Sequence, residues 1–291
     1  MGKHSVLLLM VALLAGNAPN AAVLHTEKSL YRNIVVYSEG ELLCMRFGRY
    51  NGNRQSCTNL EDPDHLEFTY TRMMLGALYL NPTPQRALIL GLGGGTLPTT
   101  LRNLYPAMRI DVVEIDPAVV RVAKQYFGFT TSRLTTAHEV DGRVFVKRAL
   151  KQAAHYDLIM LDAFDYEYIP EHMLTREFLL EVRGLLTAQG VLAANTFSSS
   201  KLYNYESATY QSVFGNFFNL KDANRVILIR RAGLPDRVEL KRNAATLEAR
   251  YKPLGVRSEW LLPMITVTKD WPVDTRVLTD QYSPANLLNS R

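Results

Sequence analysis

One segment of the chain, residues 86–142, constrains the fold more than any other. An apolar strand at 87–90 is followed by the glycine loop 91–96 (Gly-Leu-Gly-Gly-Gly-Thr), a helical stretch that ends near Leu104, and a second strand that ends in Glu114. Glycines directly after a buried strand let the backbone approach a ligand closely, and an acid at the tip of the next strand is placed to accept both ribose hydroxyls. The segment predicts a site for an adenosine cofactor.

Length and composition indicate an ordinary globular protein. The 291 residues, 47% apolar and 21% charged, suffice for one large domain with a core and a small appendage. The formal charge of +5 comes from basic residues that are scattered along the chain. We therefore expect no nucleic-acid partner.

The N-terminus has the pattern of a secretory signal peptide. Lys3 and His4 precede an apolar run at 5–15, which is followed by a small and polar stretch at 16–22. The run is too short to span a bilayer comfortably, and cleavage after Ala18 or Ala22 would suit the preference for small residues. The prediction is a protein exported to the periplasm or secreted, with no stable membrane span after cleavage. The alternative is a disordered or docked N-terminal segment on a cytoplasmic protein.

The two cysteines, Cys44 and Cys57, flank a predicted hairpin with strands at 41–47 and 54–58. A loop centred between Tyr50 and Asn51 would set them opposite each other, and a disulfide would then agree with export. A turn centred on Asn51 and Gly52 would misregister them by two residues. The sequence leaves both a disulfide and two unrelated thiols open.

Pattern changes along the chain predict its organisation. Residues 30–60 have β character, the spacing of apolar residues at 64–80 is helical, and Asn-Pro-Thr-Pro at 81–84 breaks that helix. The expected segments are a signal peptide at 1–22, an N-terminal β domain with a linking helix at 23–80, and a catalytic domain at 81–291.

Beyond residue 86 strands alternate with helices, which predicts a parallel sheet covered on both faces. The expected elements are 87–90, 97–104, 109–114, 117–126, 134–137, 143–150, 156–161, 175–186, 190–195, 202–214 and 225–231. The C-terminal stretch is expected to form one helix at 240–251 and then an irregular tail that contains proline.

Four acids fall where strands of such a sheet end: Glu114, Asp141, Asp162 and Asp165. Ligands of open α/β sheets bind outside the carboxyl ends of the strands. Glu114 suits the ribose and Asp141 the adenine amino group, while Asp162 and Asp165 suit a cationic substrate. The alternative for either of the last two is a helix cap or a local salt bridge.

Several motifs together resemble the spermidine synthase (polyamine aminopropyltransferase) family over most of residues 30–291. Residues 51–55 are similar to its Asp-Gly-x-x-Gln hairpin, and 67–73 to its Glu-Phe-x-Tyr-x-x-Met helix. Residues 114–116 and 141–142 match its adenosine-binding acids, and 162–165 keep both acids of its catalytic loop. The ending at 278–284 resembles a divergent branch of the family.

The resemblance implies an α/β fold: the Rossmann-like fold of class I S-adenosylmethionine-dependent methyltransferases, with a mostly parallel seven-stranded sheet and a small N-terminal β-hairpin domain. It implies transfer of the aminopropyl group of decarboxylated S-adenosylmethionine to putrescine or a related diamine, in a homodimer and without a metal. Asp162 would be the catalytic base, and Asp165 would anchor the diamine with Tyr70 and Glu67. The residues implied to bind the cofactor are Gln55, Gly91, Gly93, Gly95, Glu114, Ile115, Asp141 and Gly142.

Three positions depart from the family pattern. Gly94 stands where the family has the acid that holds the aminopropyl ammonium, Asn195 replaces a glutamine, and Tyr166 replaces a proline. Because of Gly94, the choice between the decarboxylated and the intact cofactor stays open.

Two other functions compete with aminopropyl transfer. A methyltransferase that uses intact S-adenosylmethionine would share the cofactor cradle, which is the glycine loop 91–96 with Glu114 at the end of the next strand. Gly94 removes a charge that would repel the methionine carboxylate. Against it, Ile89 stands where methyltransferases commonly carry an acid, and the paired aspartates favour a cationic substrate. The other competitor is a non-catalytic protein that binds polyamine or nucleoside.

Redox and metal chemistry have less support. Thr96 breaks the glycine spacing of a dinucleotide site, which disfavours a dehydrogenase. His138, His155 and His172 lack the spacing of paired metal ligands, so each is expected to be a surface or capping histidine.

Overall fold

The computed structural model describes residues 21–48, 54–163 and 170–284. An N-terminal antiparallel sheet has the order β1-β2-β3-β4. Its strands are β1 (Ala22–Lys28), β2 (Asn33–Glu39), β3 (Leu42–Phe47) and β4 (Arg54–Asn59). Strand β1 was not expected from the sequence.

The larger sheet has seven strands in the order β10-β11-β9-β8-β5-β6-β7, and only β11 runs against the others. The mostly parallel seven-stranded sheet predicted from the sequence is confirmed. The strands are β5 (Arg86–Leu90), β6 (Arg109–Glu114), β7 (Thr135–Glu139), β8 (Tyr156–Leu161), β9 (Leu186–Phe197), β10 (Phe218–Lys221) and β11 (Asn224–Arg230).

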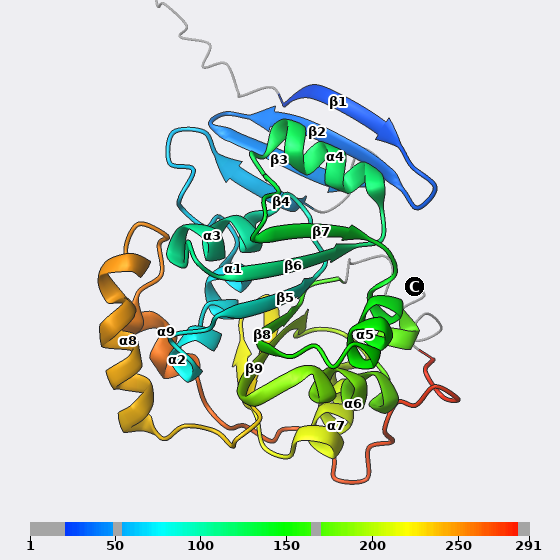
Figure 1. Ribbon diagram of the computed structural model, residues 1–291, viewed down its shortest axis with the longest axis vertical. Helices are drawn as coiled ribbons and strands as arrows, with labels where there is room; N and C mark the ends of the chain where they lie inside the picture. Colours follow the sequence, from blue (N-terminus) through cyan, green and yellow to red (C-terminus); the bar gives the residue numbers. More distant parts are fainter. Residues whose placement is uncertain (1–20, 49–53, 164–169, 285–291) are drawn as a thin grey trace, which may run out of the picture.

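Helices cover both faces of this sheet (Figure 1). Side chains alternate along β5, so that Ala87 and Ile89 face one hydrophobic cluster and Leu88 and Leu90 the other. The first cluster contains residues of α1 (Thr69–Met74), α2 (Ala77–Leu80), α3 (Thr96–Leu104), α4 (Pro117–Tyr126), α8 (Arg237–Tyr251) and α9 (Ser258–Met264). The second contains residues of α5 (Gly142–Lys151), the 3-10 turn η1 (Glu171–Met173), α6 (Arg176–Leu185) and α7 (Tyr203–Phe214).

The single helix expected at 64–80 is wrong in two respects. The helix begins only at Thr69, and Leu75 and Gly76 separate α1 from α2. A Cβ at Gly76 would lie 2.9 Å from the carbonyl oxygen of Met73 and 3.1 Å from Cδ1 of Leu228 in β11. The two short helices are therefore separate where the chain packs closely against Leu228 of the sheet. The spacing of apolar residues does not reveal this tertiary contact.

The C-terminal part also differs from the expectation. The irregular tail contains the helix α9, although Pro263 lies inside it. Pro263 is the sixth of seven residues, so its missing N–H removes little from so short a helix, and Leu261 is fully buried. Strand β10 was missed as well, and the predicted strand at 225–231 runs antiparallel to β9.

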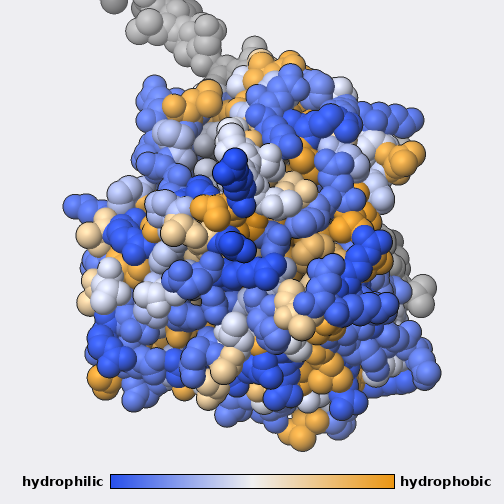
Figure 2. Space-filling view, in the orientation of Figure 1, coloured by the Kyte–Doolittle hydropathy of each residue, from blue (hydrophilic) through white to orange (hydrophobic). Residues whose placement is uncertain are grey.

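Within the described residues, no helix combines the length and apolar character needed to cross a bilayer. Hydrophilic side chains cover much of the face shown in Figure 2, and hydrophobic ones lie among them in scattered groups.

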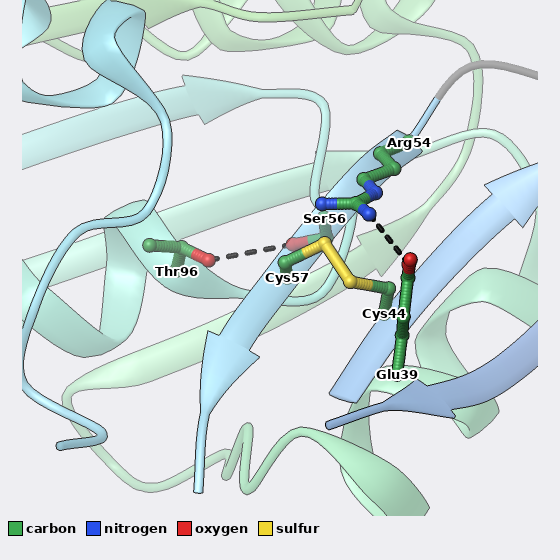
Figure 3. Close-up of a disulfide and its surroundings, with 6 residues drawn as sticks. All are labelled: Glu39, Cys44, Arg54, Ser56, Cys57 and Thr96. Atoms are coloured by element: carbon green, nitrogen blue, oxygen red, sulfur yellow. Dashed lines mark hydrogen bonds and ion pairs between the residues drawn. A yellow bond between two sulfur atoms is a disulfide. The ribbon is translucent and has the colours of Figure 1, made fainter. Parts of the chain in front are cut away.

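A disulfide joins the N-terminal strands β3 and β4. Cys44 and Cys57 are direct partners across the two strands, with their Cα atoms 4.1 Å apart, and their sulfurs are bonded (Figure 3). Of the two alternatives left open by the sequence, the structure has the disulfide. Residues 49–53, where the sequence predicts the hairpin turn, lie outside the described residues.

Replacing both cysteines, Cys44→Ala with Cys57→Ala, should lower the free energy of unfolding by about 3 kcal/mol. The bond closes a loop with a sequence separation of 13, and a cross-link of that size restricts the unfolded chain by about this amount. Urea denaturation measures the difference. Wild-type protein in reductant serves as the control and should unfold like the double variant; equal stability of oxidised wild type and variant would contradict the prediction.

Candidate active site

A cavity of about 790 Å³ opens at the carboxyl ends of β5, β6 and β8, with residues of the N-terminal sheet forming another wall. This size is in the range of small-molecule sites. The residues predicted to bind cofactor or substrate that line it are Gln55, Tyr70, Gly91, Gly93, Glu114, Ile115, Asp141, Gly142 and Asp162. The structure thus brings together most of the predicted site.

The glycine loop holds the end of β5 against the end of β8. Gly91 has φ of +101°, and a Cβ there would lie 2.2 Å from the carbonyl oxygen of Asp162. The Asp162 N–H donates to the carbonyl of Leu90 at 2.8 Å, and the Gly91 N–H donates to that of Val113 at 2.8 Å. Any side chain at position 91 would therefore displace Asp162.

Gly93 also has positive φ, +54°, and lines the cavity. Gly95 is placed differently. It is the N-cap of α3 with φ of +84°, a Cβ there would lie 2.8 Å from Cβ of Phe129, and it is not among the lining residues. Its position is that of a packing glycine behind the loop.

Glu114 is half-buried at the tip of β6, and both of its carboxylate oxygens accept hydrogen bonds from backbone N–H groups. Its Oε2 accepts from the N–H of Leu92 at 3.1 Å, and its Oε1 from the N–H of Asp116 at 3.0 Å. Burial raises the pKa of Glu114, while these two hydrogen bonds and the Arg32 guanidinium oppose the rise. Each oxygen keeps a lone pair, so the carboxylate can accept two further hydrogen bonds from a diol.

Asp141 caps α5 and contacts a histidine. Its Oδ1 accepts from the N–H of Val144 at 2.9 Å, and its Oδ2 lies 2.9 Å from Nε2 of His172. His172 was expected to be a surface or capping residue; it is partly exposed but lines the cavity beside Asp141. Gly142 lines the same wall, where a Cβ would lie 3.0 Å from Cε of Met173.

Asp162 is a half-buried acid at the end of β8. Its Oδ1 accepts from Nδ2 of Asn195 at 2.9 Å, and its Oδ2 from the hydroxyl of Tyr70 at 3.3 Å. Burial raises the pKa of Asp162 to about 7, against the opposing effect of the two hydrogen bonds. Burial and the neighbouring Asp162 hold the pKa of Tyr70 well above its usual value, so Tyr70 stays a donor.

Besides Gly95, two predicted residues are not placed in the cavity. Asp165 lies outside the described residues, as do positions 51–53 of the predicted hairpin motif and Tyr166. Glu67 is half-buried and is not among the lining residues. The roles assigned to Asp165 and Glu67 stay predictions.

The glycine that replaces the expected acid, Gly94, is closed off by its neighbours. A Cβ at Gly94 would lie 2.6 Å from Oγ of Ser56, 3.0 Å from its Cβ, and 3.1 Å from Cδ1 of Phe127. Ser56 is 5% exposed, and its hydroxyl lies 3.4 Å from that of Thr96 (Figure 3). The glycine at position 94 therefore depends on the close approach of Ser56 in β4. A larger residue at this position would require Ser56 or Phe127 to move.

The lining residues that sequence reasoning missed include Arg32, Ser56, His172, Asn195 as a partner of Asp162, and Asn224. Asn195 had been noted only as a departure from the family. The others lie on a turn, in a partner strand or at the start of β11, where no sequence motif marks them. Among the described residues, no group of three or more His, Cys, Asp or Glu could hold a metal ion.

Fold and site together define a class: a Rossmann-like α/β protein with a glycine loop and acidic side chains around a cavity at the carboxyl ends of its strands. A family model described as "Spermine/spermidine synthase domain" matches residues 67–229, and the chain belongs to this family. It is 44% identical to the polyamine aminopropyltransferase of Vibrio vulnificus (strain CMCP6), over 99% of this chain and 100% of that protein.

Solved structures agree on the fold. Spermidine synthase from Thermotoga maritima superposes with a TM-score of 0.68 at 19% identity, covering 85% of each chain. Human methyltransferase-like protein 13 in complex with SAH superposes with a TM-score of 0.56 at 26% identity, covering 74% of this chain and 99% of that one. The same fold thus occurs in both kinds of transferase.

The desolvated carboxyl of Asp162 should cost the protein stability above neutral pH. Its pKa is about 7 in the fold and about 4 when unfolded, so the native protein holds the extra proton between these values. The free energy of unfolding should therefore fall as pH rises through that window. Asp162→Asn should be more stable than wild type at pH 8, by on the order of 3 kcal/mol, and equally stable near pH 4.

Urea denaturation at the two pH values measures this difference. Asp222→Asn, on an exposed turn, is the matched control and should leave the pH dependence unchanged. A variant at Asp162 that is no more stable than wild type at pH 8 would contradict the burial cost.

Gly94→Ala should destabilise the protein by about 1–3 kcal/mol, because the new methyl group overlaps Oγ of Ser56. Adding Ser56→Gly should recover part of the loss, since only the Phe127 contact then remains. Thermal unfolding of the two single variants and the double variant measures the coupling. Additive effects of the two substitutions would show that Ser56 is not what closes position 94.

Proposed function

We propose that the protein is a polyamine aminopropyltransferase of the spermidine synthase type. It transfers the aminopropyl group of decarboxylated S-adenosylmethionine to putrescine or a related amine. The single observation that carries the proposal is the carboxyl of Asp162, which is buried at the cavity with a pKa of about 7 and lies on the same cavity as Glu114.

The reaction needs a base, because a primary amine is mostly protonated at neutral pH. The free amine nitrogen forms a bond to the methylene carbon beside the sulfonium, and the carbon–sulfur bond breaks to leave a neutral thioether nucleoside. The amine proton passes to Asp162, whose pKa near 7 suits a general base. Tyr70 and Asn195 hold the carboxylate in place.

The charges of the cavity fit a cationic substrate. Among the described residues its lining acids are Glu114, Asp141 and Asp162, and its lining arginines are Arg32 and Arg54. Glu114 suits the ribose hydroxyls and Asp141 the adenine amino group, which leaves Asp162 for the cationic reacting groups. A carboxylate in a partly desolvated cleft attracts a sulfonium and an ammonium more strongly than it would in water. Most of the acceleration would come from holding the nitrogen and carbon in line.

Methyl transfer from intact S-adenosylmethionine is the second candidate. Gly94 favours it, since the position has no charge and is closed by Ser56. The likeness to a human methyltransferase structure is consistent with it. Against it, Ile89 supplies no acid for the methionine amine, and the lining acid Asp162 suits an amine acceptor.

A product assay tests both candidates. Pure protein is incubated with putrescine and either decarboxylated or intact S-adenosylmethionine, and the products are identified by mass. We expect spermidine only with the decarboxylated cofactor. A methylated product with the intact cofactor would replace the proposal by its rival, and binding without any product would support the non-catalytic alternative.

Asp162→Asn should lower kcat by at least about a hundredfold, because the base is lost, while binding of the nucleoside product stays close to wild type. In the wild type, kcat/KM should fall as pH drops below about 7, where Asp162 takes up its proton. Steady-state kinetics and isothermal titration calorimetry measure these quantities. A variant with near-wild-type kcat would remove Asp162 from the role of base.

We also propose export through the N-terminal signal peptide and assembly as a homodimer. The disulfide between Cys44 and Cys57 supports export, because such bonds persist in oxidising compartments. The homodimer rests on the family resemblance alone. Mass determination of the mature N-terminus from the native host tests the first proposal, and sedimentation of the full chain tests the second.

A further inference from the structure

The amide of Asn195 joins Asp162 to a residue on the neighbouring strand. Nδ2 of Asn195 donates to Oδ1 of Asp162 at 2.9 Å, and Nδ2 of Asn224 donates to Oδ1 of Asn195 at 3.1 Å. Asn195 is 4% exposed, so neither end of its amide has free access to water. The three side chains form one directed chain of hydrogen bonds.

The antiparallel pairing of β9 and β11 brings these side chains together. Asn195 is opposite Val226 and Phe197 is opposite Asn224, so Asn195 and Asn224 are diagonal neighbours on one face of the sheet. The backbone of Asn224 is fixed too, because its carbonyl accepts from the hydroxyl of Ser198 at 2.9 Å and from the N–H of Asp222 at 2.8 Å.

We propose that Asn224 is a positioning residue: it fixes the amide orientation of Asn195, and through it keeps Oδ1 of Asp162 an acceptor. The proton taken from the amine then goes to Oδ2. This inference rests on the proposed role of Asp162 as the base, and it adds a residue that acts on Asp162 through Asn195.

The physical reason lies in what a flip of the Asn195 amide would cost. A protonated Asp162 could donate to Asn195 only if the amide turned its oxygen toward Asp162. With Asn224 in its observed orientation, that turn would point the NH₂ group of the buried Asn195 at the NH₂ group of the half-buried Asn224 and leave the Asn195 donors without a partner. Asn224 therefore disfavours a proton on Oδ1 and favours the ionised form of Asp162, which is the form that accepts a proton.

Other groups around Asp162 leave this role to the amide chain. Tyr70, on α1, contacts Oδ2 and stays protonated. Among the described residues, the further charged or titratable groups that line the same cavity are Tyr31, Arg32, Arg54, Glu114, Asp141 and His172. Among the described residues, burial raises the pKa of Asp162, and the hydrogen bonds from Asn195 and Tyr70 lower it.

The test is a titration of the Asp162 carboxyl in full-length protein carrying ¹³C in its aspartate carboxyls, with the Asp162 signal assigned by its loss in Asp162→Asn. Asn224→Ala should raise the midpoint by about half a pH unit, because the flipped amide is no longer penalised. Asn224→Asp should raise it by about one unit or more, since a carboxylate forces the NH₂ group of Asn195 away from Asp162 and adds a like charge.

Ser198→Ala is the matched control, because it removes a hydrogen bond from the backbone of Asn224 and leaves the amide chain intact. Its midpoint should stay at the wild-type value. In kinetics, the acid limb of kcat should move upward with the titration in the two Asn224 variants, while KM for the nucleoside stays close to wild type.

The outcomes separate this inference from the proposed function. Unchanged midpoints in both Asn224 variants, or an equal shift in Ser198→Ala, would overturn the inference even if the wild type makes spermidine. Shifted midpoints in a protein that transfers no aminopropyl group would instead overturn the proposed function and the proton transfer to Oδ2. Should Asn224→Asp fail to fold, Asn224→Ala alone decides.

Discussion

The site depends on the close approach of two strand ends. The backbone of Gly91 passes so near the carbonyl of Asp162 that no Cβ fits between them. This contact sets the glycine loop, which faces the nucleoside cradle, and Asp162, the proposed base, at a fixed separation. Because backbone atoms alone make the contact, the spacing does not vary with side-chain conformation. Preorganisation of this kind is what an in-line displacement requires.

Burial of Asp162 serves the chemistry and weakens the fold through the same physical effect. Desolvation raises the pKa of its carboxyl to about 7, where a base can accept a proton at neutral pH and still be ionised before it does so. The ionised form is correspondingly costly to bury. The hydrogen bonds from Asn195 and Tyr70 offset part of this cost and do not remove it. Elsewhere the sheet is covered by two apolar clusters.

The sequence predicts what local pattern determines and misses what tertiary contact determines. The strand–glycine loop–strand pattern placed Glu114, Gly91 and Asp162 at one edge of a parallel sheet, because strand direction follows from the alternation with helices. It could not reveal the break at Gly76, which depends on Leu228 in a distant strand. Nor could it place Asn224, since that requires β11 to run antiparallel to β9. The sequence left the pairing of Cys44 and Cys57 open, because the register of their two strands depends on the position of one turn.

At position 94 a local departure from the family pattern is matched by a contact with a distant strand, β4. Ser56 of β4 fills the space in front of Gly94, and the disulfide at the adjacent Cys57 ties β4 to β3. An acid could therefore return to position 94 only if β4 moved or Ser56 became smaller. Recognition of the ammonium on the transferred group must then come from elsewhere in the cavity, and Asp162 is the described lining acid that the nucleoside does not occupy. In this arrangement the carboxylate of Asp162 attracts both the sulfonium and the ammonium of the reaction. The ionisation state of Asp162, and the Asn195 amide that supports it, are therefore more important than in a site with a separate acid.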